Sequence, residues 1–478
     1  MAASWYFHDY ETFGADPVRD RPAQFAGQRT TPELEPIDEP LLIHCRPSAD
    51  LLPNPEACLI TGITPQFAHR EGLPEPEFFA RIHEQMATPE TCVLGYNSIR
   101  FDDEVTRHGL WRNFFDPYAR EWRNGCSRWD LIDLARMCYA LRPEGVNWPQ
   151  REDGSASFKL EQLAAANAID HGQAHDALAD VQATIALARL LRRAQPRLFD
   201  FLFALRDKRR AAALLDWTQQ TPVLHASSRI AAERGCLALM LPIAPHPHNP
   251  NGVIVFDLDT DPAPLAALSA EDIRDRVFVA RSDLPEDVQR LPLKVVHLNK
   301  CPALAPMSAL TGVDLARIHL DLQRCLGHAE QIRAMPALAH KLQTVFAGTH
   351  EPGQAPAEHV LYSALPEHAD LALAARVRRA DPAQLHEFSG RFKDVRYRDL
   401  LRRYRARHYP DTLSDQERQA WRDWRRQQLL EAPETPERCI PALLERVVQL
   451  RAAHPPGPKQ VVLDQVESWL SAMLAELA

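Results

Sequence analysis

Two acidic residues near the start of the chain have the spacing of metal ligands. Asp9 and Glu11 end the apolar run that begins at Trp5. In a strand, alternate side chains share a face, so both carboxylates would point the same way and His8 would point away. Carboxylate oxygens suit hard divalent cations, and their repulsion is costly without a positive charge between them. Because this pattern is also typical of a solvated strand end, a metal site requires further ligands.

Two later stretches supply such ligands. Asp102 follows the apolar run 91–97 and opens a predicted helix, and Asp180 lies at the edge of an apolar helical stripe. A carboxylate there is costly to bury unless it is paired or bound to a metal. His175 precedes that helix, and its ordinary pKa of about 6.5 suits a general base. Together with Asp9 and Glu11, these side chains could complete a site for divalent cations.

The elements that position these residues read as mixed α/β over residues 1–195. Strands separated by helices predict a mixed sheet covered by helices. The acids that follow Asp102, at positions 103 and 104, are expected only to favour the helix dipole. The predicted strands are Trp5–Glu11, Glu39–Cys45 and Thr91–Asn97, and the predicted helices are 76–86, 102–115, 127–141, 158–167 and 176–193.

The pattern changes after Pro196, where short β-like runs separated by turn residues predict a small barrel within a second domain, 196–349. Past a Pro- and Gly-containing linker at 348–358, nearly continuous helical patterns predict a third domain, 350–478. Ser414 and Glu417 there form a predicted capping box. The predicted barrel strands are Pro222–Ala226, Gly235–Ala244, Asn251–Leu258, Val277–Ala280 and Leu293–Asn299.

Composition sets the outer bounds. The chain has 478 residues, enough for several domains, and a net charge of −9. We expect neither a secretory signal nor a membrane span. Nine cysteines without a C-x-x-C pair predict reduced thiols in a cytoplasmic protein. The arginines of 396–407 are equally consistent with a polyanion-binding face and with solvated helix faces.

Several stretches resemble the bacterial exonuclease I family within the DEDDh exonuclease superfamily. The order D-x-E, Asp, H-x4-D matches the histidine subclass, since position 176 is Asp where the sister subclass has Tyr. The likeness is close over residues 5–205 and looser beyond. The stretches are Phe7–Gly14, Asp20–Ala26, Leu59–Pro65, Gly95–Arg107, Tyr139–Gly145, Val295–Pro302 and Tyr404–Arg407.

The resemblance implies an α/β RNase H-like exonuclease domain, an SH3-like β-barrel and an all-α C-terminal domain, forming a clamp around the strand. It implies 3′→5′ hydrolysis of single-stranded DNA to mononucleotides in DNA repair and recombination. The expected cofactor is two Mg²⁺ ions, with Mn²⁺ as an alternative, held by Asp9, Glu11, Asp102 and Asp180, with His175 as catalytic base. A monomer is expected.

Basic and aromatic residues interleave between the second and third motifs, a mixture that suits single strands. The resemblance implies that five residues, four of them in this mixture and one further along the chain, contact the strand. Thr12 and Phe13 are expected to contact the terminal nucleotide. At position 159 the family commonly has arginine, so lysine replaces a bidentate contact by a point charge. The five are Arg107, Tyr118, Trp122, Arg136 and Lys159.

The resemblance also implies a partner, the acidic and apolar C-terminal tail of single-stranded DNA-binding protein, with Arg142 and Phe201 as the candidate pocket. Two other functions stay open. An exoribonuclease would keep the fold, but compact members of that kind lack the barrel and helical domain. A silent strand-binding clamp would not need such costly crowding of charge.

Overall fold

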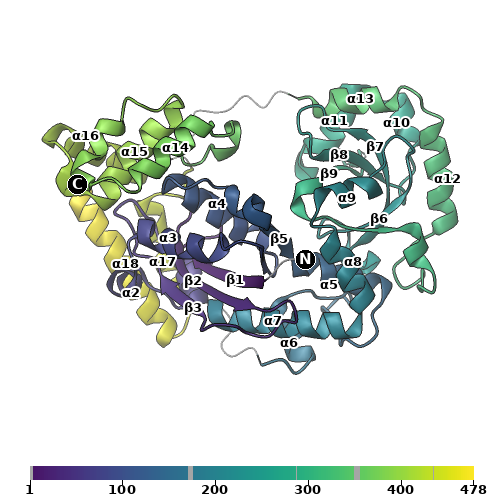
Figure 1. The fold of residues 1–478 in the computed structure, drawn as a ribbon, viewed down its shortest axis with the longest axis horizontal. Coiled ribbons are helices and arrows are strands. Elements are labelled where there is room, and N and C mark those ends of the chain that lie inside the picture. The colour runs from purple at the N-terminus through teal and green to yellow at the C-terminus, as the bar shows by residue number, and fades with distance from the viewer. Residues whose placement is uncertain (1–3, 171–175, 287, 349–355, 434) are drawn as a thin grey trace. The chain divides into compact units, whose positions relative to one another are not determined.

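The computed structural model describes residues 4–170, 176–286, 288–348, 356–433 and 435–478 (Figure 1). The chain divides into two compact units. The first comprises Met1–Ser127, Gly172–Gln182 and Pro352–Ala478, and the second comprises Arg128–His171 and Ala183–Glu351. The four predicted metal carboxylates therefore all belong to the first unit. Within the described residues, no helix is both long and apolar enough to cross a membrane.

A mixed sheet lies at the centre of the first unit, as predicted, with strand order β3-β2-β1-β4. β2 runs antiparallel to both β1 and β3, whereas β4 runs parallel to β1. β2 escaped the sequence analysis because glutamines and a glycine interrupt its apolar residues. The strands are β1 (Ser4–Thr12), β2 (Pro22–Thr30), β3 (Leu41–His44) and β4 (Thr91–Gly95).

Helices of the same unit pack on this sheet. Buried Val105 and Leu110 of α4 share an aromatic cluster with Tyr6, Tyr10 and Phe25 of β1 and β2, which fixes α4 beside the central strand. Short helices α1 and α2 begin at prolines behind the capping side chains of Asn54 and Thr64. The helices are α1 (Pro55–Thr61), α2 (Pro65–Glu71), α3 (Glu75–Met86) and α4 (Asp102–Arg112).

The C-terminal part of the first unit is helical, as predicted, and Figure 1 shows α14 and α15 beside α4. Trp111 at the end of α4 packs with Tyr397 and Leu400 of α15. The capping box is confirmed, since the Ser414 side chain accepts from the Glu417 backbone and the Glu417 side chain accepts in return. The helices are α14 (His368–Val377), α15 (Val395–His408), α16 (Asp415–Arg426), α17 (Ile440–Ala453) and α18 (Pro458–Leu477).

Several α15 arginines are buried in ion pairs, which neither interpretation of this cluster anticipated. Glu358 accepts from Arg21 at 2.8 Å, from Arg403 at 2.6 Å and from Arg407 at 2.9 Å. Arg407 also donates to Asp50 at 2.6 Å. All five side chains are at most 10% exposed. These ion pairs join α15 to the loops beside the sheet.

Strand β5 (Ser127–Asp130) begins at the last residue of this part of the first unit, and its other residues belong to the second unit. A helix was predicted from residue 127. The helix starts only at Leu131, because Asp130 is extended and its side chain accepts from the Ile132 backbone as an N-cap. This helix is α5 (Leu131–Leu141). The helices that follow it are α6 (Leu160–Ala166), α7 (Ala177–Ala194), which starts in the first unit, α8 (Pro196–Ala204) and α9 (Lys208–Leu214).

An antiparallel sheet of order β10-β6-β7-β8-β9 follows. The predicted strand Val277–Ala280 is wrong, because a capping box at Ser269 opens a helix through Phe278 and buries Ile273 and Val277 at helical spacing. The elements are β6 (Val223–Ala226), β7 (Leu237–Pro245), β8 (Gly252–Asp257), β9 (Leu293–His297), β10 (Ala303–Pro306), α10 (Ala263–Ala267), α11 (Ala270–Phe278), α12 (Leu322–Arg333) and α13 (Leu338–Phe346).

Candidate metal centre

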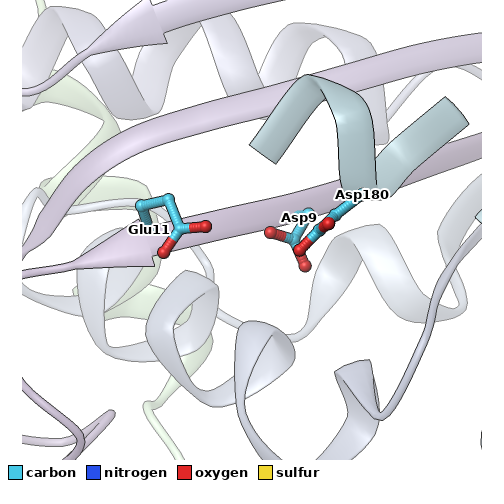
Figure 2. A group of neighbouring side chains, drawn as sticks. All are labelled: Asp9, Glu11 and Asp180. Carbon is cyan, nitrogen blue, oxygen red and sulfur yellow. The ribbon is translucent and has the colours of Figure 1, made fainter. Parts of the chain in front are cut away.

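Three carboxylates meet where β1 passes the first turn of α7. Asp9 and Glu11 come from the same face of β1, and Asp180 comes from α7. One oxygen of each lies within 4.8 Å of the others. Figure 2 shows the Asp9 and Asp180 carboxylates close together, with Glu11 farther along the strand. The period of two in the sequence therefore places the first pair as predicted, and the helix supplies the third carboxylate.

Asp102 approaches the same strand from α4. A left-handed residue, Asn97 (φ 64°), and a 3-10 turn at Ser98–Arg100 redirect the chain between β4 and this helix. The Tyr10 backbone N–H donates to Asp102 Oδ1 at 3.1 Å, and Asp102 is 4% exposed. Asp102 falls outside the group of three. The hydrogen bond nevertheless fixes its carboxylate against the β1 backbone between Asp9 and Glu11.

Electrostatics make this cluster receptive to cations. Burial, followed by the charges of Asp102, Asp180 and Glu11, raises the pKa of Asp9 well above its ordinary value. Burial and then Asp180 and Asp102 raise the pKa of Glu11 to about 8. A bound cation reverses this preference by stabilising the ionised forms. The donors are all carboxylate oxygens, the type that magnesium and manganese prefer, so the residues present fit such ions.

His8 lies on the face of β1 away from the carboxylates, as predicted. His8 is 2% exposed, and its Nδ1 lies 3.2 Å from the Leu94 carbonyl oxygen. Burial is the main cause that lowers its pKa to about 4. His8 is thus a neutral core residue on the opposite face from Asp9. His175 lies outside the described residues, and its role as catalytic base stays a prediction.

The acids after Asp102 do more than favour a helix dipole. Asp103 binds Arg120 at 2.7 Å in a pair whose side chains are at most 2% exposed. Glu104 accepts from Arg107 at 3.0 Å. The partner of Asp103 lies in the later turn Ala119–Glu121, which no local pattern of the sequence indicates. The Asp103–Arg120 pair joins the first turn of α4, and therefore Asp102, to the segment that follows the helix, whereas Glu104 and Arg107 form a pair within α4.

Among the predicted strand contacts in the first unit, Arg107 and Tyr118 lie together and Trp122 is 63% exposed. The Arg107 guanidinium donates twice to Glu121, at 2.7 Å each, and lies 5.6 Å from the Tyr118 ring centre. Thr12 donates to the Gly14 carbonyl at 2.6 Å. Phe13 is 1% exposed and packs in the core against α17 and α18, so we leave its ring out of the candidate strand surface.

In the second unit, Arg136 donates to Asp133 and lies 5.7 Å above the Phe158 ring, while Lys159 is exposed at the start of α6. Arg142 donates to the Leu141 and Thr311 carbonyls. Phe201 of α8 is 38% exposed. The lysine and the phenylalanine are thus available to ligands, whereas both arginines have internal partners.

The mixed sheet and its clustered carboxylates belong to a segment that a family model identifies as an exonuclease domain. A family model described as Exonuclease matches residues 6–188. The models Exonuclease I SH3-like domain and Exonuclease I C-terminal domain match residues 206–348 and 355–473. These matches confirm the predicted order of an RNase H-like exonuclease domain, an SH3-like domain and a helical C-terminal domain.

Similar proteins show which family of exonucleases the chain belongs to. Exodeoxyribonuclease I of Escherichia coli (strain K12) is 47% identical over 428 residues, covering 89% of this chain and 90% of the relative. A solved exonuclease I from Methylocaldum szegediense superposes with a TM-score of 0.93 at 48% identity, covering 98% and 99% of the two chains. The zinc-bound E. coli exonuclease I complex with single-stranded DNA gives 0.93 at 43% identity, covering 99% and 100%. The chain belongs to the exodeoxyribonuclease I family.

Proposed function

We propose that this enzyme removes mononucleotides from the 3′ end of single-stranded DNA by metal-dependent phosphodiester hydrolysis. The observation that carries the proposal is the meeting of Asp9, Glu11 and Asp180 oxygens within 4.8 Å. Asp102 stands beside them on the β1 backbone. The relative whose solved complex contains single-stranded DNA supports the substrate class.

In the proposed mechanism, Asp9, Glu11, Asp102 and Asp180 hold two ions. When bound, divalent ions supply charge for the phosphate oxygens and lower the pKa of water. His175 takes the proton from the attacking water, and the strand is held by Thr12, Arg107, Tyr118, Trp122, Arg136 and Lys159. We propose magnesium as the ion, with manganese as an alternative, because the donor set is made of carboxylates.

Activity at limiting magnesium is expected to fall as the pH drops below about 8. Glu11 has a pKa raised to about 8 without metal, so below that pH its proton competes with the ion. Raising the magnesium concentration should therefore move the acidic limb to lower pH. Initial rates on oligo(dT) from pH 6 to 9.5, at two magnesium concentrations, measure this shift. If the acidic limb of the pH–rate profile lies at the same pH at both magnesium concentrations, the titrating group is one that does not bind metal.

Replacing His175 by glutamine is expected to lower kcat by about 100-fold, at the low end for loss of a general base. The magnesium concentration for half-maximal rate should change less than threefold, because the carboxylates are retained. Single-turnover rates across a magnesium titration separate the two quantities. An unchanged rate would remove His175 as the base.

A time course on end-labelled substrates tests the proposed function directly. Single-stranded DNA labelled at its 5′ end should yield a ladder of shortening strands, and 3′-labelled DNA should yield labelled mononucleotide at once. Duplex DNA and RNA should persist, and chelator should stop the reaction. RNA degraded as fast as DNA would favour the exoribonuclease alternative, and binding without hydrolysis would favour a silent clamp.

Other parts of the proposal rest on the family resemblance. We place the protein in the cytoplasm as a monomer that serves DNA repair and recombination, with domains 1–195, 196–349 and 350–478. Its proposed partner is the C-terminal tail of single-stranded DNA-binding protein, held by Arg142 and Phe201. Fluorescence anisotropy of a labelled acidic tail peptide tests this site, since Arg142→Ala should weaken its binding.

A further inference from the structure

Gln24 of β2 is a buried polar side chain that the proposed mechanism does not use. It pairs with Glu11 across the antiparallel strands β1 and β2, and it is 7% exposed. Because directly paired residues share one face of a sheet, its side chain lies on the face that carries Asp9 and Glu11. A buried amide is costly unless its oxygen and its nitrogen both find hydrogen-bond partners, so these partners indicate its role.

The oxygen of the Gln24 amide binds the start of the helix that carries Asp180. The Ala177 backbone N–H donates to Gln24 Oε1 at 3.2 Å. Ala177 is the first residue of α7 and is fully buried, so neither the helix nor solvent offers this N–H an acceptor. The next N–H, of Leu178, donates to the Asp176 side chain at 3.2 Å within the same segment. Of these two bonds, the one to Gln24 therefore ties the helix to the sheet.

His44 of β3 determines which way the Gln24 amide points. Gln24 Nε2 lies 3.2 Å from His44 Nε2. A backbone N–H can only donate, so the amide oxygen faces Ala177 and the amide NH2 group faces His44. Burial lowers the pKa of His44, which favours the neutral ring, whose Nε2 accepts from this group. The His44 ring is held in turn by an edge contact with Phe67, at 5.0 Å between ring centres.

This chain of hydrogen bonds runs from β3 across β2 to the first turn of α7. Asp180 lies three residues after Ala177, which is less than one turn of the helix. The meeting of the Asp9, Glu11 and Asp180 oxygens within 4.8 Å requires this turn to keep its place over β1. Groups that stand behind the ligands of a metal hold the geometry on which its affinity depends.

A buried glutamine can also be an ordinary core residue, and Gln28 is an example on the same strand. It lies four residues after Gln24 on the same face of β2, and it is also 7% exposed. Its amide donates to the carbonyl oxygens of Arg29 at 3.1 Å and Asp38 at 2.5 Å, in β2 and the loop that follows it. The two glutamines thus share strand, face and exposure, and they differ in their partners.

We propose that Gln24 is a positioning residue of this exonuclease, which holds the first turn of α7, and with it Asp180, in the place where the carboxylates bind a divalent cation. The proposal rests on the function proposed above and deepens it. Gln24 acts through the Ala177 N–H and not on the ion or the substrate directly. His44 keeps the amide in the orientation that this bond requires.

The test compares Gln24→Met with the matched control Gln28→Met in initial rates across a magnesium titration. Methionine keeps the length of the side chain but removes the amide. Gln24→Met should raise the magnesium concentration for half-maximal rate by about 10- to 100-fold, the usual effect of removing a group behind metal ligands. Gln28→Met should stay within about threefold of the parent. The Kd of labelled oligo(dT) in chelator should stay within about twofold in both variants, because the proposed strand contacts are retained.

Equal magnesium requirements in the two variants would overturn the inference, because loss of any buried amide would then have the same effect. The proposed function would still stand if the parent digests DNA with magnesium, so the two failures are distinguishable. Hydrogen exchange in chelator, resolved to single amides by fragmentation, provides a second measurement. The Ala177 amide should be protected in the parent and should exchange at least about tenfold faster in Gln24→Met. If Gln24→Met does not fold, the parent decides, and an unprotected Ala177 amide there would overturn the inference too.

Discussion

Asp180→Asn is expected to lower metal-dependent mononucleotide release by about 1,000-fold or more, equivalent to about 4 kcal/mol of transition-state stabilisation. The substitution keeps the shape of the side chain but removes one of the three charges that meet within 4.8 Å. Single-stranded DNA binding in chelator should persist, since the proposed strand contacts lie on other residues. Release of labelled mononucleotide and anisotropy of labelled DNA measure the two quantities separately.

Asp176→Asn is the matched control for Asp180. It makes the same change of charge four residues earlier, and asparagine can replace the hydrogen bond that Asp176 accepts from the Leu178 backbone at 3.2 Å. Its rate should stay within about threefold of the parent. Digestion of DNA by Asp180→Asn at the parental rate would make the assignment of the metal centre wrong.

Glu358→Gln is expected to lower the free energy of unfolding of the first unit by about 3–5 kcal/mol. The change leaves Arg21, Arg403 and Arg407 buried with less compensating charge, and removal of one partner from a buried ion pair typically has this cost. Urea unfolding followed by tryptophan fluorescence measures the loss. Glu77→Gln, which breaks the exposed pair with Arg81, should change the same quantity by less than about 0.5 kcal/mol.

The effect of Glu358→Gln should depend on pH in a defined direction. Burial alone would raise the pKa of Glu358, but Arg407, Arg21 and Arg403 lower it well below 4.5. A lowered folded-state pKa contributes stability above the unfolded value and loses it as the pH falls through the folded value. The difference between parent and variant should therefore be full at pH 6 and shrink below pH 4.5. A constant difference from pH 6 to pH 3 would contradict this assignment.

The sequence predicted which carboxylates of β1 and α7 lie together because local periods place them. A period of two puts Asp9 and Glu11 on one face, and a helical stripe brings Asp180 to the sheet. The tertiary partners were not predictable in the same way. Asp50 and Arg407 are 357 residues apart, and nothing in either local pattern indicates the other. For this reason the local pattern of α15 predicts surface arginines where the structure has buried ones.

Errors in the fold have similar physical causes. The segment Val277–Ala280 is apolar and β-branched at its start, but a distant N-cap at Ser269 settles it as the end of a helix. Phe13 lies two residues after Glu11 and was expected at the terminal nucleotide, yet its ring is buried in a core cluster with residues of α17 and α18. Chain position places a backbone near a site, whereas tertiary packing decides where the side chain points.

The packing of Phe13 with α17 and α18 also determines when its apolar surface can be buried during translation. Residues near the start of the chain complete their core only with Leu443, Val447 and Leu470, close to its end. During synthesis at about 5–20 residues per second, this apolar surface waits on the order of half a minute or more for its partners to leave the ribosome. The apolar surface around Phe13 therefore lacks its C-terminal partners through most of translation, and chaperones that shield apolar surface have their longest opportunity to act there.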